Sequence, residues 1–197
     1  MPDALSPGCV IVTGMPGAGK TTITDLVGRR LGRAAQVGGD AVNEMIRSGF
    51  VWFMGQPTDE ALRQDELCNR NMCALANNFI DFGFTVLMDT VLADRAELDF
   101  FIALMSPRPV RLVVLAPSIE VCKHRNANRA PEDRFDFDGY ERLQADMQRE
   151  FTGIGWWLDS GELTADETAD MVVGGLLDRA AVLAPGWNDW LRRLHDQ

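Results

Sequence analysis

Residues 14–22 form a glycine-rich loop directly after a short apolar run, and this pairing constrains the fold more than any other feature. The apolar run, 9–12, reads Cys-Val-Ile-Val, and the loop consists of Gly14, Met15, Pro16, Gly17, Ala18, Gly19, Lys20, Thr21 and Thr22. The loop has the spacing G-x-x-x-x-G-K-T, and a helical pattern of apolar residues follows it. A strand, loop and helix in this order predict a cradle for the phosphates of a nucleoside triphosphate.

The residue types in the loop match the chemistry of phosphate binding. Gly14, Gly17 and Gly19 permit backbone angles that turn amide N–H groups toward an anion. Lys20 supplies a positive charge at the β- and γ-phosphates, and Thr21 is the expected hydroxyl ligand of Mg²⁺. The helix that begins near Lys20 adds its positive N-terminal end. A glycine-rich turn before an ordinary helix is the structural alternative, but it does not account for the Lys-Thr pair.

The chain is long enough for one well-packed domain. Of its 197 residues, 46% are hydrophobic, and no segment is apolar over the length needed to cross a membrane. Residues 1–8 lack the basic flank and apolar core of a signal peptide and predict a disordered lead. A domain over 9–184 and a tail over 185–197 follow. We therefore expect a cytoplasmic protein with no membrane partner.

The charge and the cysteines exclude several kinds of site. The formal net charge of -10 repels polyanions, which argues against nucleic acid as a partner and favours a small acceptor molecule. Salt screens surface charges over about 8 Å, so this charge does not prevent nucleotide binding at the loop. The scattered Cys9, Cys68, Cys73 and Cys122 predict buried or half-buried thiols rather than a zinc site or a disulfide framework.

Strand-like and helical patterns alternate along the chain. The strand-like runs are 9–13, 35–37, 84–89, 110–115 and 155–158. The helical patterns are 20–31, 40–48, 59–82, 95–104 and 118–128, and a capping box at 164–167 opens a last helix. Strands joined through helices need crossover connections, so we expect an α/β three-layer sandwich with a mainly parallel five-stranded sheet. Ligands of such sheets lie beyond the carboxyl ends of the strands.

Asp40 follows the second strand-like run and the pair Gly38-Gly39. The glycines allow a tight turn that leaves Asp40 facing the crevice, opposite the γ-phosphate. A carboxylate there can deprotonate or align an acceptor hydroxyl, which makes Asp40 a candidate catalytic and substrate-binding residue. The structural alternative is a helix N-cap, because aspartate often satisfies the free N–H groups at the start of a helix.

Asp89 ends the apolar run 84–89 and is the candidate metal-shell carboxylate. In that role it holds water or the Thr21 hydroxyl around Mg²⁺. Helix capping or an exposed loop is the structural alternative. The roles of Asp40 and Asp89 can also be exchanged, since the sequence gives no distance between them.

Several cations are gathered in the segment 123–134, at the end of a helical pattern and in the polar loop after it. Arginines near a helix C-terminus often only complement the helix dipole. The functional interpretation is a lid, over about 129–139, whose arginine neutralises charge on a transferring phosphoryl group. Arg129 and Arg134 are the candidate catalytic arginines, and Arg125 is a candidate to stack on the nucleotide base.

Aromatic residues are clustered directly after the helix that Asp40 begins. Phe50, Trp52 and Phe53 are candidates for an apolar wall of the acceptor pocket, although core packing is the commoner role of such a cluster. The tail carries apolar residues that we expect to pack on the domain or on a partner chain, as in a homodimer: Trp187, Trp190 and Leu194.

Together the loop at 14–22, the Gly-Gly-Asp at 38–40, Asp89 and the segment 123–134 resemble the small P-loop kinases related to chloramphenicol phosphotransferase. The resemblance implies a P-loop NTPase fold like that of nucleoside and shikimate kinases, with the sheet order 2-3-1-4-5. It implies that Asp40 is the base that deprotonates the acceptor hydroxyl. It also implies transfer of a γ-phosphate to a small molecule, often an antibiotic, whereas related enzymes act on sugars, shikimate or nucleosides.

The leading hypothesis is a Mg²⁺-dependent small-molecule kinase that uses ATP or GTP. In this hypothesis Asp40 activates an acceptor alcohol, and Lys20 with a lid arginine offsets the developing charge. The candidate acceptors are antibiotics, whose phosphorylation would confer resistance, nucleosides and sugars. A nucleotide-dependent switch or binding module is the alternative from another class, although the chain lacks an Asn-Lys-x-Asp guanine motif. The acidic charge disfavours a polynucleotide 5′-hydroxyl kinase.

Overall fold

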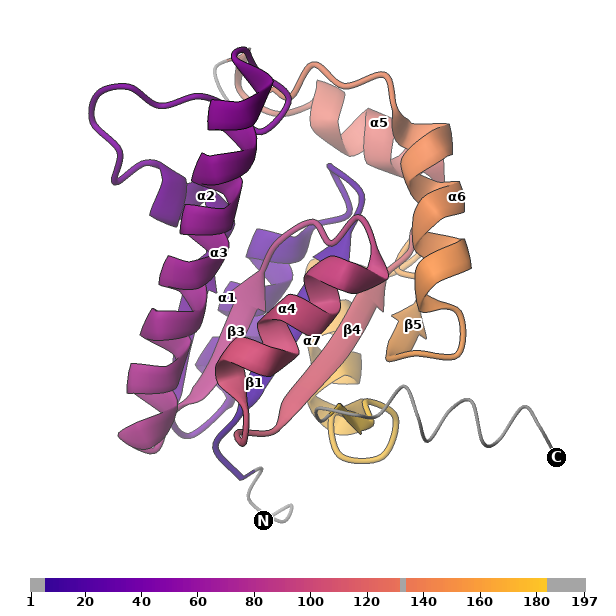
Figure 1. Cartoon of the computed structure of the whole chain (residues 1–197). Coiled ribbons are helices and arrows are strands. Elements are labelled where there is room, and N and C mark those ends of the chain that lie inside the picture. The colour runs from indigo at the N-terminus through magenta and orange to yellow at the C-terminus, as the bar shows by residue number, and fades with distance from the viewer. Residues whose placement is uncertain (1–5, 132–133, 184–197) are drawn as a thin grey trace, which may run out of the picture.

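The computed structural model describes residues 6–131 and 134–183 and has an α/β architecture (Figure 1). Its strands are β1 (Cys9–Gly14), β2 (Ala34–Gly38), β3 (Thr85–Asp89), β4 (Val110–Leu115), β5 (Trp156–Leu158) and β6 (Val182–Leu183). Its helices are α1 (Lys20–Arg30), α2 (Gly39–Asn43), α3 (Thr58–Asp81), α4 (Arg95–Met105), α5 (Ile119–Ala127), α6 (Tyr140–Phe151) and α7 (Ala165–Gly175). Strands and helices thus alternate as the sequence predicts.

The sheet has the order β2-β3-β1-β4-β5, which confirms the expected order. These strands are paired in parallel, and the short β6, which the sequence pattern does not single out, is antiparallel to β4. Val12 of β1 lies beside Asp89 of β3, and Gly38 of β2 lies on the other side of Asp89. The ends of these three strands, and the segments that follow them, therefore share one edge of the sheet.

Helices cover both faces of the sheet, which gives the expected three layers. α3 packs against α4, β2 and β3, whereas α1 packs against α7. In Figure 1, α4 lies in front of the sheet, and α1 and α7 lie behind it. Because β1, β3 and β4 are covered on both faces, all of their residues are buried and most are apolar.

Side-chain caps fix where several helices begin. Thr164 and Glu167 form the expected capping box at the start of α7. Asp94 accepts a hydrogen bond from the N–H of Glu97 and caps α4, and Ser118 caps α5 in the same way. Each cap satisfies a backbone N–H group that the helix itself leaves without a partner.

Two helical segments differ from the sequence prediction. The helix expected over 40–48 ends at Asn43, and tighter turns follow it. The sequence interpretation assigns no helix to the region of α6, yet Tyr140, Met147 and Phe151 are spaced to form one buried face of this helix. The remaining residues of α6 are mostly charged or polar, which makes its apolar stripe narrow.

All four cysteines are buried and unpaired, as the sequence predicts. Residues 1–5 of the expected lead lie outside the described residues, and so does the whole tail with Trp187, Trp190 and Leu194. Within the described ranges, no helix has both the length and the apolar character that a membrane span requires.

Candidate functional site

The loop between β1 and α1 has the backbone that a phosphate cradle requires. Gly17 and Gly19 have φ angles of 83° and 96°, a region that favours glycine, and Gly19 is the N-cap of α1. A Cβ at Gly17 would collide with the Cys122 carbonyl of α5, so the loop packs directly against that helix. The free N–H groups at the start of α1 therefore open onto the space that the loop encloses.

The Lys20 side chain folds back over this loop. Its Nζ donates hydrogen bonds to the carbonyl oxygen of Gly14 at 3.0 Å and to the next carbonyl at 3.3 Å. Burial lowers the pKa of Lys20 to about 8, the charges of Asp89 and Asp40 oppose this shift, and the charge of Arg129 adds to it. The structure thus gathers these charged groups, which come from separate segments, around the phosphate loop.

Asp89 is buried at the end of β3 and its carboxylate is fully engaged. Its Oδ1 accepts a hydrogen bond from the Thr21 hydroxyl at 3.0 Å. Its Oδ2 accepts hydrogen bonds from the Thr24 hydroxyl at 3.3 Å and from the Gln36 amide at 3.2 Å. Sequence reasoning misses Thr24 and Gln36. The signal for Thr24 is its place one helical turn after Lys20, on the face of α1 that meets the sheet.

The oxygen atoms of Thr21 and Asp89 suit Mg²⁺, a hard cation that takes oxygen ligands. In nucleotide sites Mg²⁺ usually keeps several waters and binds through one or two protein groups and the phosphates. Across 6–131 and 134–183, no group of three or more acidic, thiol or imidazole side chains could hold a metal ion by itself. The donor set therefore fits a magnesium ion shared with a bound nucleotide.

Asp40 is exposed and lies at the start of α2. The N-cap of α2 is Gly38, with no side-chain cap, so Asp40 does not have the capping role that is its structural alternative. Among the described residues, its carboxylate has no hydrogen-bond or ion-pair partner. Its negative charge nevertheless raises the pKa of Lys20 and that of Cys68 of α3. The Asp40 carboxylate is therefore open to a ligand beside the phosphate loop.

Further polar side chains lie on this side of the site, between α3 and α4. Asn69, which is buried on α3, donates a hydrogen bond to Glu97 of α4 at 3.2 Å. Burial raises the pKa of Glu97 to about 7, hydrogen bonds oppose this shift, and the charge of Asp65 adds to it. Burial also raises the pKa of Asp65. The charges of Asp65, Asp40 and Glu97 all help to raise the pKa of the Cys68 thiol. These three carboxyl groups therefore form one acidic side of the site.

Arg125 of α5 is half-buried beside the phosphate loop. Its guanidinium donates hydrogen bonds to the carbonyl oxygen of Ala18 at 3.4 Å and to that of Ser160 at 2.9 Å. Ser160 follows β5, and its own hydroxyl is buried with no hydrogen-bond partner among the described residues. The contact joins α5, the phosphate loop and the segment after β5. Stacking of Arg125 on the nucleotide base stays a prediction.

The two candidate lid arginines lie differently. The charge of Arg129 contributes to the lowered pKa of Lys20, so Arg129 lies near the phosphate loop. Arg134 is exposed, and its Nε donates a hydrogen bond to the Arg129 carbonyl at 3.0 Å. Arg129 is thus gathered into the site, whereas the Arg134 side chain is held on the backbone of its own segment.

The aromatic candidates do not enter the core. Trp52 is half-buried, while the exposed fractions of Phe50 and Phe53 are 45% and 50%. The Trp52 ring lies 4.7 Å from the ring of Phe53 and 5.2 Å from that of Phe135, measured between centroids. Their position after α2 keeps them as candidates for a wall beside Asp40.

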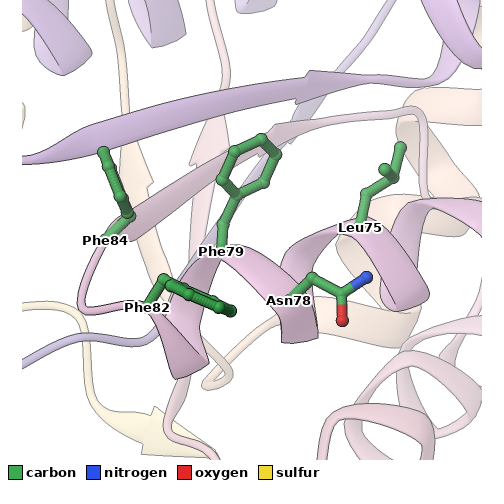
Figure 2. A pocket seen from close by; sticks show the side chains of 5 residues that line it. All are labelled: Leu75, Asn78, Phe79, Phe82 and Phe84. Carbon is green, nitrogen blue, oxygen red and sulfur yellow. The ribbon is translucent and has the colours of Figure 1, made fainter.

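An apolar hollow of about 300 Å³ lies at another place, and Figure 2 shows the side chains that line it: Leu75, Asn78, Phe79, Phe82 and Phe84. They belong to the C-terminal end of α3 and to the segment before β3, at the edge of the sheet opposite the phosphate loop. The hollow has no charged lining residue. It therefore lacks the groups that phosphate chemistry needs, and we do not place the site there.

Residues 9–154 match the family described as an AAA domain, and no curated protein matches the chain. The tunicamycin resistance protein of Deinococcus radiodurans has a similar structure, with a TM-score of 0.67 and 14% identity over 90% of this chain and 99% of that chain. The Mycobacterium tuberculosis APS kinase CysC is also similar, with a TM-score of 0.60 and 18% identity over 88% of this chain and 99% of that chain. A sugar kinase from Janibacter sp. HTCC2649 has a TM-score of 0.61 and 19% identity over 86% of this chain and 94% of that chain. These likenesses confirm the expected P-loop kinase fold.

Proposed function

We propose that this chain, which belongs to the AAA domain family, is a phosphotransferase that moves the γ-phosphoryl group of ATP or GTP to a hydroxyl group of a small molecule. One observation carries the proposal. Among the described residues Asp40 has no hydrogen-bond partner for its carboxylate, whereas Asp89 is bound to Thr21 and is buried. In the proposal Asp89 therefore serves the metal shell, and Asp40 serves the acceptor.

In the proposed reaction the acceptor hydroxyl oxygen attacks the γ-phosphorus, and the bond from this phosphorus to the β,γ-bridging oxygen breaks. The nucleoside diphosphate leaves with the bonding electron pair, and the hydroxyl proton passes to the Asp40 carboxylate. Lys20 and Arg129 offset the negative charge on the phosphoryl oxygens. Arg134 contributes by holding the backbone at Arg129, to which its side chain is bonded.

The hydroxyl of Thr21 would hold Mg²⁺, and Asp89 would orient that hydroxyl or a water ligand. The hydrogen bond of 3.0 Å between the two side chains supports this part of the proposal. A magnesium ion held in this way would offset the negative charge of the phosphates. Thr24 and Gln36 keep the Asp89 carboxylate in place from its other oxygen.

The nucleotide base would lie against Arg125, near Ser160. Two hydrogen bonds fix the Arg125 guanidinium there, and the buried Ser160 hydroxyl is a further polar group beside it. Both ATP and GTP offer ring surface for such a contact. The acidic field of the chain favours a small acceptor over a polynucleotide.

The acceptor would be held between Asp40, the polar side chains of α3 and α4, and an aromatic wall of Phe50, Trp52 and Phe53. This combination suits a molecule with several hydroxyl groups and an apolar face, as in many antibiotics, sugars and nucleosides. A cytoplasmic location, where the nucleotide is abundant, belongs to the same proposal.

A screen of acceptors tests the function. The protein is incubated with MgATP or MgGTP and with hydroxyl-bearing antibiotics, sugars and nucleosides, and mass spectrometry detects products with one added phosphoryl group. The proposal expects one chemical class to be phosphorylated with at least one of the two nucleotides. Hydrolysis of the nucleotide at the same rate with every compound, and no phosphorylated product, would favour the nucleotide switch instead.

A further inference from the structure

The two segments that flank the site contact each other through aromatic rings. The Trp52 ring, in the segment between α2 and α3, lies 5.2 Å from the Phe135 ring, in the segment between α5 and α6, with an angle of 74° between the planes. Edge-on contacts of this kind are the favoured geometry of aromatic pairs. Figure 1 shows the segment after α5 reaching over toward the N-terminal end of α3. Trp52 and Phe135 therefore join the acceptor side of the site to the lid side.

Each of the two segments is anchored to a helix by one amide side chain. Gln64 of α3 accepts a hydrogen bond from the N–H of Val51 at 2.8 Å and donates one to the carbonyl of Gly49 at 2.8 Å. Asn126 of α5 accepts from the N–H of Phe135 at 3.1 Å and donates to its carbonyl at 2.7 Å. An amide can donate and accept at once, so each fixes the backbone that carries one of the two rings.

The contact continues toward the phosphate loop. The ring of Phe137 lies 5.6 Å from that of Phe135 and 5.0 Å from that of Tyr140 at the start of α6. We call Trp52, Phe135, Phe137 and Tyr140 the aromatic ladder. Tyr140 is buried, and the charge of Arg129 acts on its hydroxyl. The ring contacts thus connect Trp52, on the acceptor side, with the start of α6.

The two ends of the ladder are packed differently. Tyr140 belongs to the main apolar core and Phe137 packs against it, whereas Trp52 and Phe135 are not part of that core. Loss of the contact between Trp52 and Phe135 should therefore cost little global stability. It should instead loosen the segment at 134–139, whose position this contact helps to fix.

We propose that Trp52 and Phe135 are positioning residues that couple the acceptor segment to the lid arginine. While the two rings are in contact, residues 134–139 keep their position, and the hydrogen bond from the Arg134 side chain to the Arg129 carbonyl holds Arg129 beside the phosphoryl group. Transfer to the acceptor is then favoured over transfer to water. This inference rests on the proposed function and adds to it the means by which the acceptor side acts on the donor side.

Hydrogen exchange of the free protein tests the contact without an acceptor. Trp52→Ala should speed amide exchange over 134–139 by about two- to tenfold, the range expected for one aromatic pair. In Trp52→Ala/Phe135→Ala, residues 134–139 should exchange no faster than in Phe135→Ala, because the contact between the two rings is already lost in the single variant. Phe82→Ala is the matched control, since Phe82 is 79% exposed at the opposite end of α3. Unchanged exchange in Trp52→Ala would overturn the proposal.

The partition of the γ-phosphoryl group between acceptor and water tests whether the ring contact favours transfer to the acceptor. With an acceptor found by the screen, Phe135→Ala, which leaves the proposed acceptor wall intact, should lower the ratio of phosphorylated acceptor to inorganic phosphate by about two- to tenfold, with an unchanged nucleotide KM. An unchanged ratio would overturn the coupling. If exchange responds but the wild-type protein phosphorylates nothing, the proposed function fails and the contact stands. If the wild-type protein is an active kinase and exchange does not respond, only the coupling fails.

Discussion

The proposed donor side of the site, around Lys20 and Asp89, and the proposed acceptor side, around Asp40, satisfy their polar groups in different ways. On the donor side, Lys20 is bonded to loop carbonyls, and Asp89 accepts hydrogen bonds from three neighbouring side chains. On the acceptor side, Asp40 has no hydrogen-bond partner among the described residues, and Phe50 and Phe53 are exposed. Lys20 and Asp89 are thus engaged with neighbouring protein groups, whereas the Asp40 carboxylate and the rings of Phe50 and Phe53 remain accessible.

The difference matches the way in which each kind of ligand would be recognised. Triphosphates are the same in every nucleotide, so backbone N–H groups and a lysine suffice to bind them. An acceptor must be told apart from other small molecules, which requires side chains whose polar and apolar groups are not already engaged. Substitutions on the donor side should therefore abolish all nucleotide chemistry, and those on the acceptor side should divert it.

The largest effect is expected from Lys20→Ala, which removes the positive charge of the donor side. Transfer should fall by about a thousandfold, because the phosphoryl oxygens lose a positioned charge in a water-poor site. Nucleotide consumption without acceptor should fall with it. Both rates are measured with MgATP and MgGTP, and circular dichroism verifies that the variant is folded. Retained transfer at more than a tenth of the wild-type rate would contradict the role of Lys20.

Asp40→Asn should separate phosphoryl transfer from nucleotide binding. We expect transfer to fall by about a hundred- to a thousandfold, since the amide cannot take the hydroxyl proton, while the nucleotide affinity is unchanged. Glu44→Gln is the matched control, because Glu44 is an exposed carboxylate one turn later. Transfer rates and calorimetric nucleotide affinities are compared for both variants. Full transfer by Asp40→Asn would remove the base assignment.

Asp89→Asn should weaken the metal dependence of the donor side. The new amide nitrogen faces groups that now donate hydrogen bonds to Asp89, and one of these groups must lose its acceptor. The Mg²⁺ concentration for half-maximal transfer should rise by about ten- to a hundredfold, as for other groups that orient a metal ligand. A magnesium titration at saturating nucleotide measures it. An unchanged titration would place the magnesium shell elsewhere.

Glu97 should make the acceptor side sensitive to pH. Its pKa is raised to about 7 by burial, with Asp65 and Asp94 adding to the shift. The folded chain therefore binds this proton more tightly than the unfolded chain, so stability is lost as pH rises from about 4.5 to about 7. Between pH 5 and pH 8 this loss is about 2–3 kcal/mol, and we expect Glu97→Gln to remove it, as measured by urea unfolding of both proteins at the two pH values. Equal pH dependence of the two proteins would contradict the shift.

The donor side could be predicted from the sequence because its parts are contiguous. The spacing of 14–22 defines the loop, and Asp89 ends an apolar strand, so each signal lies within a few residues. The alternation of patterns likewise predicts the layers, and the family resemblance implies the sheet order. The early end of α2 and the existence of α6, whose apolar stripe is narrow, could not be predicted from the sequence pattern, because packing against neighbouring elements decides both.

The acceptor side could be predicted only in part. The turn at 38–40 indicates Asp40, but Asp65 and Glu97 come together only because α3 packs against α4. Their spacing along the chain carries no such signal. The contact between Trp52 and Phe135 is equally invisible in the sequence, since it depends on the path of two long connections. Residues that are far apart in the chain and lie in loops leave no periodic pattern to read.

The proposed function is transfer of the γ-phosphoryl group from a nucleotide to an acceptor, and the stoichiometry of this transfer is its sharpest test. A nucleotide labelled in its γ-phosphate is consumed with and without the acceptor found by the screen, and the label is traced to the acceptor and to inorganic phosphate. We expect nucleotide consumption to depend on the acceptor, with nearly all of the label recovered on the acceptor. Release of the label as inorganic phosphate at the same rate, whatever acceptor is present, would contradict the proposed function.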